Sequence, residues 1–302
     1  MEASLDWGMW AMQFGNVERD VMAYRDPPPV TPTGFDALDA VLGGGLVPGI
    51  HVLMGQPGAG KSALALDMAL RVALGRGRVL YVSAEMDRMQ CLARLCSNLT
   101  AQGADGLEPV RWGRWESMGR MCPKGGEDAG TAALRALARL APGLAVADGG
   151  AAVTAPGLAS VTKAAAQAGA DLIVVDYLQR IGWPPGTGPE DAYQAISKAS
   201  ESLAKTAKAA RVPMLVLSSM NRASMKDGKP TLSGGRGSAS IEYDAVTVMQ
   251  LMAEGDTGGD GLRPVALHVL KNRRGRVTGD SPLHLVFDGA ACRFGVGRMQ
   301  YS

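Results

Sequence analysis

The fold of this chain is decided by the stretch HVLMGQPGAGKSALALDMALRVAL, residues 51–74. Its first five residues form an apolar run typical of a buried strand, and residues 62–74, SALALDMALRVAL, predict a helix. Between them, residues 55–62 read GQPGAGKS and fit the pattern GxxxxGK[ST], which requires this order of strand, loop and helix. A chance glycine-rich turn is a poor alternative because a predicted strand precedes the loop and a predicted helix follows it, as the motif requires. The stretch therefore predicts a phosphate-binding loop inside an α/β fold.

The residue types of this loop suit a nucleoside triphosphate. Glycines let the backbone wrap a phosphate chain with its N–H groups pointing inward. Lys61 would reach the β- and γ-phosphates, and the Ser62 hydroxyl would bind Mg²⁺. We therefore expect ATP and Mg²⁺ as cofactors. The residues predicted to cradle the ATP phosphates are Gly55, Gln56, Pro57, Gly58, Ala59, Gly60, Lys61 and Ser62.

Other apolar runs alternate with helical patterns, which is typical of a mostly parallel sheet covered by helices on both faces. After residue 240 the apolar runs follow one another without helices, so antiparallel strands are expected at the C-terminal edge of the sheet. Residues 101–142, rich in glycine and charge, give no clear pattern. The further strands are expected at 78–85, 144–148, 171–177, 213–219, 245–252, 264–271 and 281–288, and helices at 157–169 and 192–210.

Composition excludes several classes of protein. The 302 residues, 46% of them hydrophobic, can build a core without disulfide or metal staples. A net charge of +2 excludes a wholesale basic coat for nucleic acid, although it leaves a local basic site open. The four cysteines form no CxxC pair and no signal peptide is indicated, so a reduced, cytoplasmic chain is expected. No apolar stretch is long enough for a membrane span, so no membrane partner is expected.

Two acidic residues follow apolar runs. Asp176 ends the run LIVV, so its carboxylate should emerge at the carboxyl end of a central strand, the usual place of the second acid associated with Mg²⁺. The alternative is an ordinary solvated aspartate at the end of a strand. Glu85 ends the run RVLYVSA and could orient and deprotonate an attacking water. Its alternative is a carboxylate at a helix start, facing the helix dipole.

Seven short motifs occur in a fixed order along the chain. They are TGFDALD (33–39), the phosphate loop, VSAEM (82–86), DYLQ (176–179), NR (221–222), SIE-x-DA (240–245) and KNRRG (271–275). In this order they resemble the carboxyl-terminal RecA-like ATPase domain of the DnaB-type replicative helicases. The resemblance runs from about residue 31 to residue 295, and it implies a RecA-like P-loop NTPase fold.

The resemblance also implies an activity. It predicts an ATP-dependent DNA helicase or translocase that hydrolyses ATP at subunit interfaces and moves on single-stranded DNA in replication. A homo-oligomer, expected as a hexameric ring, and a loader or primase are the implied partners. Residues 31–302 would form the ATPase domain. Residues 1–30 would be an amino-terminal arm or linker, and the amino-terminal domain usual in the family is expected to be absent. This arm is either a frayed tail or an amphipathic segment that docks on a partner subunit.

Residue roles follow from the matching motifs. Lys61 and Ser62 bind phosphate and Mg²⁺, Asp176 is the Walker B acid, and Glu85 is the catalytic carboxylate. Lys271 and Arg273 match the basic pair that, in the family, reaches into the ATP site of the neighbouring subunit. A guanidinium in trans would stabilise the charge that develops on the γ-phosphate. The alternative for residues 271–276 is a basic hairpin tip, solvated or touching nucleic acid, and this reading is kept for Arg274 and Arg276.

A candidate DNA-binding loop covers residues 226–238, KDGKPTLSGGRGS. Exposed N–H groups and the cations Lys226, Lys229 and Arg236 suit a phosphate backbone and carry no base specificity. In the family the matching loop lines the channel of the ring, and Arg236 and Gly237 would lie there. The family often has glutamate at the position of Gly237. The alternative is a flexible surface loop. No aromatic side chain lies in the loop, so stacking on bases is not expected.

One departure from the family favours a different function. Where the family reads SerGlnLeuAsnArg, this chain has Ser219 in place of the glutamine, and its side chain is too short for the same contact with the γ-phosphate. The alternative is therefore a DNA-stimulated ATPase without processive unwinding, a RadA-like accessory or mobile-element factor. The segment LGGGLVPG (42–49) is also RadA-like, but the four-cysteine zinc module of RadA has no counterpart here. A binding scaffold with a dead ATP site is disfavoured because Lys61, Ser62, Glu85 and Asp176 are all present.

Overall fold

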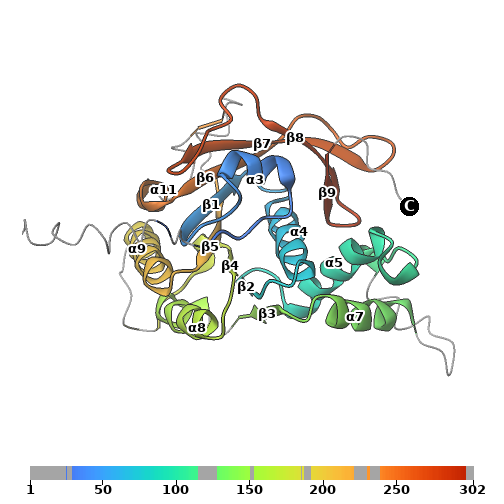
Figure 1. Ribbon diagram of the computed structural model, residues 1–302, viewed down its shortest axis with the longest axis horizontal. Coiled ribbons are helices and arrows are strands. Elements are labelled where there is room, and N and C mark those ends of the chain that lie inside the picture. The colour runs from blue at the N-terminus through green and yellow to red at the C-terminus, as the bar shows by residue number, and fades with distance from the viewer. Residues whose placement is uncertain are drawn as a thin grey trace, which may run out of the picture.

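The computed structural model describes residues 25, 29–114, 128–149, 153–184, 186, 192–220, 230–231 and 239–296. Their strands form one nine-stranded sheet in the order β3-β2-β4-β5-β1-β6-β7-β8-β9, with helices packed against it (Figure 1). The strands are β1 Gly49–Gly55, β2 Val79–Ser83, β3 Leu144–Asp148, β4 Leu172–Asp176, β5 Pro213–Ser219, β6 Thr247–Ala253, β7 Leu262–Asn272, β8 Leu283–Asp288 and β9 Arg293–Gly295.

The sheet has a parallel part and an antiparallel part. Strand β1 lies between β5 and β6 and is parallel to both, and β2, β3 and β4 continue the parallel part. Strands β7, β8 and β9 are antiparallel and extend the sheet beyond β6. This confirms the predicted α/β fold with antiparallel strands at the C-terminal edge. Strand β9 was not predicted because a three-residue strand is too short to show a periodic pattern.

Two hydrophobic clusters cover the two faces of the sheet. Along β1, the side chain of Leu53 belongs to the cluster under α3, α4, α5 and α7, whereas Val52 and Met54 belong to the cluster under α8 and α9. Every residue of β1 is buried, which explains why this strand reads as a continuous apolar run. The helices are α3 Asp36–Leu42, α4 Lys61–Leu74, α5 Arg88–Ala101, α7 Ala129–Leu140, α8 Ala155–Gln167, α9 Ala192–Ala210 and α11 Ala239–Asp244, with 3-10 turns η1 Ala104–Gly106, η2 Trp112–Arg114 and η4 Leu178–Arg180.

Helix α7 lies in the segment whose sequence shows no clear pattern. Its buried residues are Gly130, Ala133, Ala136 and Leu137, at the spacing of one helix face. Leu134 and Leu140 also pack against this core, so with Leu137 they place three leucines along the buried side of the helix. The helix begins at a regular cap, because the side chain of Asp128 accepts from the backbone N–H of Thr131 at 2.9 Å.

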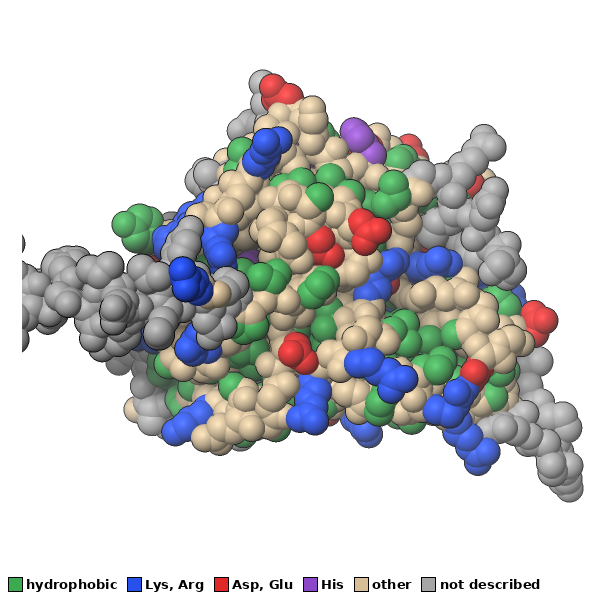
Figure 2. Space-filling view, in the orientation of Figure 1, with side chains coloured by type: hydrophobic (Ala, Val, Ile, Leu, Met, Phe, Trp, Pro, Cys, Tyr) green, Lys and Arg blue, Asp and Glu red, His purple; other side chains and the backbone are tan. Residues whose placement is uncertain are grey.

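The surface agrees with the near-neutral charge. On the face shown in Figure 2, Lys and Arg side chains are interspersed with hydrophobic and uncharged groups and do not form a continuous coat. Among the described residues, no helix combines the length and the apolar character that crossing a bilayer requires. The proposed amino-terminal arm falls outside the described residues except for residues 25, 29 and 30.

Candidate active site

The phosphate loop starts at the end of β1 and closes onto the first turn of α4. Gly60 caps α4 with a φ of 99°, in the left-handed region that favours glycine. A Cβ at Gly60 would lie only 3.2 Å from the ring of Phe294 and 3.3 Å from the ring of Phe287. The glycine is therefore required both by the backbone conformation and by the aromatic pair packed beneath the loop.

Lys61, the first residue of α4, folds its side chain back over the loop. Its Nζ donates to the backbone carbonyl oxygens of Gly55 and Gln56, each at 3.0 Å. Burial lowers the pKa of Lys61, and the charges of Asp176 and Glu85 act in the opposite sense. The ammonium group thus lies over the cradle, bonded to two carbonyls that a phosphate chain could replace.

Asp176 is the last residue of β4, and its side chain is buried. The residue is 1% exposed and its Oδ2 accepts from the hydroxyl of Tyr81 at 2.7 Å. Burial raises the pKa of Asp176, and hydrogen bonds from Tyr81 and Ser62 oppose that rise. The alternative of an ordinary solvated aspartate is therefore wrong, because this carboxylate lies in the interior beside the Ser62 hydroxyl.

Glu85 lies two residues beyond the end of β2 and is exposed to the same cavity as Asp176. A different residue caps the following helix. The side chain of Asp87 accepts from the backbone N–H of Gln90 at 2.7 Å, and the side-chain oxygen of Gln90 accepts from the backbone N–H of Asp87. Because this reciprocal pair is a complete capping box, helix α5 does not use Glu85 as its cap.

A cavity of about 670 Å³ brings together five of the eight residues predicted to bind the ATP phosphates, Pro57, Gly58, Gly60, Lys61 and Ser62, whereas Gly55, Gln56 and Ala59 do not line it. Its volume falls in the range of small-molecule sites, and its hard oxygen donors, the Ser62 hydroxyl and the Asp176 carboxylate, are those that Mg²⁺ prefers. The residue types present therefore fit a nucleoside triphosphate with Mg²⁺. The lining residues include Gly58, Gly60, Lys61, Ser62, Glu85, Asp176 and Ser219.

Part of the cavity wall was not predicted from the sequence. It consists of Arg94, Trp112, Phe287, Gly289 and Cys292. The guanidinium of Arg94 lies 4.1 Å from the centre of the Trp112 ring, and the indole N–H of Trp112 donates to the carbonyl of Gly289 at 2.8 Å. These residues come from α5, η2, strand β8 and the turn between β8 and β9, and no motif joins them in the sequence.

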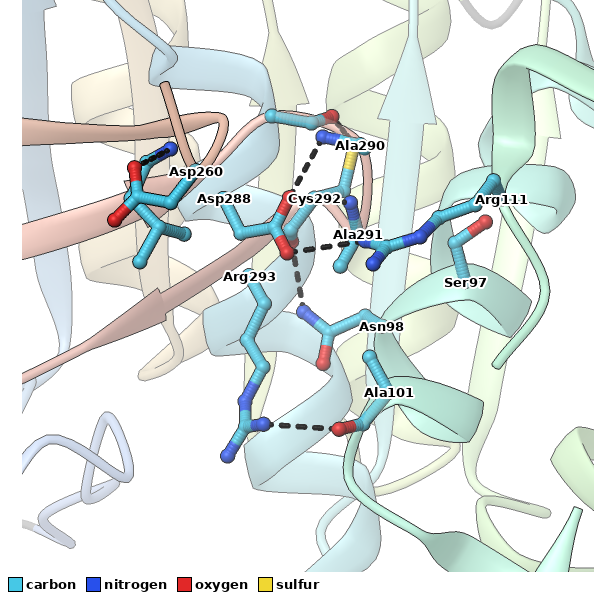
Figure 3. A network of polar contacts seen from close by, with 12 residues as sticks. Ser97, Asn98, Ala101, Arg111, Asp260, Asp288, Ala290, Ala291, Cys292 and Arg293 are labelled. Carbon is cyan, nitrogen blue, oxygen red and sulfur yellow. Dashed lines mark hydrogen bonds and ion pairs between the residues drawn. The ribbon is translucent and has the colours of Figure 1, made fainter. Parts of the chain in front are cut away.

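A polar network holds the β8–β9 turn against α5 (Figure 3). Asp288 accepts from two backbone N–H groups of the turn, at 2.9 and 3.0 Å, and forms an ion pair with Arg111 at 3.1 Å. The amide of the buried Asn98 donates to the carbonyl of Cys292 at 2.8 Å, and Arg293 donates to the carbonyl of Ala101 at 3.0 Å. The turn that forms one wall of the cavity is therefore fixed to the helix that follows Glu85.

Lys271 and Arg273 lie at the opposite end of the strands from the phosphate loop, beside the start of β1. Lys271 donates to the carbonyl of Tyr243 at 2.7 Å, and so does Arg273, also at 2.7 Å. The backbone N–H of Arg273 bonds to Val246, whose own N–H bonds to Ile50 of β1. Five residues of strand, about 16 Å, separate Ile50 from the end of β1. The structure therefore does not bring this pair to the cavity of its own chain.

The candidate DNA-binding residues Lys226, Lys229, Arg236 and Gly237 lie outside the described residues. Within the same segment, the backbone N–H of Thr231 donates to the side chain of Gln250 on β6 at 3.0 Å. Ser219, which replaces the glutamine usual in the family, lines the ATP cavity at the end of β5. The side chain of Gln179 joins this strand end to β4, because it donates to Ser218 at 2.9 Å and accepts from the N–H of Ser219 at 3.3 Å.

Comparison with known families agrees with this arrangement. The family described as DnaB-like helicase C terminal domain matches residues 31–295. The chain belongs to the DnaB-like helicase family. The replicative DNA helicase DnaB of Leifsonia xyli subsp. xyli is 31% identical over 269 residues, which cover 87% of this chain and 55% of that protein. This DnaB-like chain therefore spans about half the length of that relative.

Two further comparisons describe the fold and the alternative function. The DnaB-like chain superposes on the solved structure of a DnaB-like replicative helicase with a TM-score of 0.71 and 20% identity, over 99% of this chain and 68% of that one. The DNA repair protein RadA of Mycobacterium tuberculosis (strain CDC 1551 / Oshkosh) is 54% identical, but over only 66 residues, 22% of this chain and 13% of that protein. The RadA similarity is thus local, whereas the DnaB similarity extends over most of the chain.

Proposed function

We propose that this chain is an ATP-hydrolysing DNA helicase or translocase of the DnaB type, which moves on single-stranded DNA in replication. The observation that carries the proposal is the cavity in which the phosphate loop, the buried Asp176 and the exposed Glu85 meet. ATP binding and hydrolysis need these three elements in one place. The family membership supports the further step from ATPase to helicase.

In the proposed mechanism Lys61 exchanges its bonds to Gly55 and Gln56 for bonds to the β- and γ-phosphates. Ser62 and Asp176 would hold Mg²⁺, which would supply positive charge to neutralise the phosphate oxygens. Tyr81 keeps one carboxylate oxygen of Asp176 engaged and so fixes the orientation of the other. Glu85 accepts the proton of the attacking water, and its exposed position leaves room for that water.

We further propose that Lys271 and Arg273 act in the ATP site of a neighbouring subunit. Both lie too far from the phosphate loop of their own chain, and both donate to carbonyls at the end of α11. Burial lowers the pKa of Lys271, and the neighbouring charge of Arg273 acts in the same sense. The charges of Asp244 and Glu242 act to raise the pKa of Lys271, and an incoming γ-phosphate would add a further anionic partner for the pair of cations.

The proposed assembly is a homo-oligomeric ring of six subunits in the cytoplasm, with single-stranded DNA in its channel. Lys226, Lys229, Arg236 and Gly237 would contact the DNA backbone, and a loader or primase would be a further partner. Residues 31–302 would form the ATPase domain and residues 1–30 its arm. The bond between Thr231 and Gln250 supports the DNA assignment, because it ties the proposed loop to β6, the neighbour of the strand that leads into the phosphate loop.

Strand displacement on a forked DNA substrate tests the proposal directly. Wild type should displace the strand with ATP and Mg²⁺, Lys61→Ala should lose both hydrolysis and displacement, and a mass measurement should give a multiple of the chain mass. A monomer that hydrolyses ATP without displacing a strand would overturn the motor proposal.

The second candidate function is a DNA-stimulated ATPase that does not unwind processively. One observation favours it, namely Ser219 at the wall of the cavity, where its short side chain leaves the end of β5 without a long polar group directed at the γ-phosphate. In that case DNA would raise ATP turnover while strand displacement stayed at background. If ATP were bound but not hydrolysed with any DNA, neither function would hold.

A further inference from the structure

One cation contacts the phosphate loop from outside the ATP cavity. Arg263 is the second residue of β7, and its Nη2 donates to the carbonyl oxygen of Gly58 at 2.8 Å. Strand β6 is parallel to β1, and β7 is antiparallel to β6. The start of β7 therefore lies at the same end of the sheet as the carboxyl end of β1, where the phosphate loop begins. Two segments 205 positions apart in sequence are joined by this bond.

The guanidinium of Arg263 is held by the aromatic pair beneath the loop. It lies 5.3 Å from the centre of the Phe287 ring, its cross-strand partner on β8. Phe287 stacks on Phe294 with centroids 4.5 Å apart and an angle of 16° between the rings. The same two rings lie beneath Gly60, so the aromatic pair supports the loop at its helix end while Arg263 supports it at its tip.

The charge of Arg263 is not neutralised locally. None of the ion pairs among the described residues includes it, and its Nε is buried without a hydrogen-bond partner in that part of the chain. A buried donor without a partner is costly, and a guanidinium that contacts a carbonyl and an aromatic ring leaves a net positive charge beside the loop. Both features are tolerated more easily where an anion is expected close by.

The tip of the loop has little other support. Gly58 has a φ of +76°, and a Cβ built on it would touch nothing within 4 Å. A glycine in open space has more conformational freedom than any other residue, and that freedom is lost when the loop closes on a phosphate chain. A bond that already fixes the Gly58 carbonyl reduces this loss, which is how preorganisation raises affinity.

We infer that Arg263 is a positioning residue for the phosphate loop, which holds the Gly58 carbonyl outward and keeps a positive charge behind the cradle. The inference rests on the proposed function, because it assumes that the cradle takes a nucleotide. Arg263 acts through Gly58 and is not placed in contact with the reacting atoms.

Nucleotide binding by three variants tests this role. Arg263→Met keeps an unbranched stem over Phe287 but removes the donors and the charge, whereas Arg263→Lys keeps the charge. Arg76→Met, at an exposed position just beyond the end of α4 farthest from the phosphate loop, is the matched control. The probe is ADP with Mg²⁺, titrated by calorimetry, together with the KM and kcat for ATP and the melting temperature without nucleotide.

We expect Arg263→Met to weaken ADP binding about tenfold, equal to about 1.4 kcal/mol, and to raise KM while kcat stays within about twofold of wild type. Arg263→Lys should recover part of the affinity, and Arg76→Met should bind as wild type does. Wild-type affinity in Arg263→Met would overturn the inference. So would a loss of affinity that Lys does not recover and that accompanies a lower melting temperature, because this pattern describes only a structural role.

The two proposals fail in different ways. If wild type itself does not bind ADP, the proposed function is overturned, and with it this inference. If wild type binds and hydrolyses nucleotide while Arg263→Met binds it equally well, only the role of Arg263 is overturned.

Discussion

Replacing Tyr81 with phenylalanine removes one hydroxyl and leaves the ring in place. Tyr81 is fully buried, and its hydroxyl donates to the Oδ2 of Asp176, which is 1% exposed. Hydrogen bonds to charged groups contribute about 1.5–3 kcal/mol, and a buried acceptor left without its donor pays its desolvation in full. Because water cannot replace the hydroxyl in this interior, we expect Tyr81→Phe to lower the free energy of unfolding by about 2 kcal/mol.

Urea unfolding at pH 8 in the presence of EDTA measures this loss without interference from Mg²⁺. The control is Tyr243→Phe, because Tyr243 is 77% exposed and its substitution should change stability by less than about 0.5 kcal/mol. The concentration of Mg²⁺ that supports half-maximal ATP hydrolysis should also rise in Tyr81→Phe, since the carboxylate loses the bond that orients it. If Tyr81→Phe is as stable as the Tyr243→Phe control, the Tyr81 hydroxyl does not hold Asp176.

Three further substitutions have definite expected outcomes. Gly60→Ala should abolish ADP binding measured by calorimetry and lower stability by about 1–3 kcal/mol, because it combines a φ of 99° with a clash against Phe287 and Phe294. Burial lowers the pKa of His51 to about 4, below its value of about 6.5 in the unfolded chain. Between these two values only the unfolded chain binds the proton, so the free energy of unfolding decreases as the pH is lowered from about 6.5 to about 4. This term amounts to about 3 kcal/mol, and in urea unfolding at pH 7.5 and pH 4 His51→Gln should lose that much less stability than wild type. Asp288→Ala should loosen the β8–β9 turn and raise the KM for ATP severalfold with little change in kcat. An unchanged KM would mean that this turn does not contribute to nucleotide binding.

The sequence predicted the parts of the fold that one strand or one loop determines alone. The run before Gly55 is apolar throughout because β1 is buried on both faces, and the run before Asp176 is apolar for the same reason. Helix α7 was not predicted, although Leu134, Leu137 and Leu140 pack on the core at helical spacing, because the glycines and charges of residues 101–142 obscure that pattern. Periodicity therefore identified the central elements and missed a helix within a segment of mixed composition.

The candidate site divides in the same way. Lys61, Ser62, Glu85 and Asp176 each follow a recognisable run, and the structure brings them to one cavity. The wall formed by Trp112 and the β8–β9 turn could not be predicted, since its contacts join residues about 177 positions apart and depend on the antiparallel strands folding back. The contact between Arg263 and Gly58 is of the same kind, because nothing in the local sequence of either residue points to the other.

The proposed ATP site is built by two chains, with the phosphate loop from one and Arg273 from the other. Mixing two inactive variants tests it most directly. Lys61→Ala has an intact Arg273 but no functional loop, and Arg273→Ala has an intact loop but no finger. Each alone should bind single-stranded DNA yet fail to show DNA-stimulated ATP hydrolysis, and Arg273→Ala should still bind ATP.

In an equal mixture about a quarter of the interfaces of a ring would pair an intact loop with an intact Arg273, so hydrolysis should return to about that fraction of the wild-type rate. Each variant mixed with wild type provides the control for subunit exchange. A site shared between two chains predicts this recovery in the mixture of the two variants. Wild-type turnover by Arg273→Ala alone, or no recovery in a mixture whose subunits are seen to exchange, would contradict it.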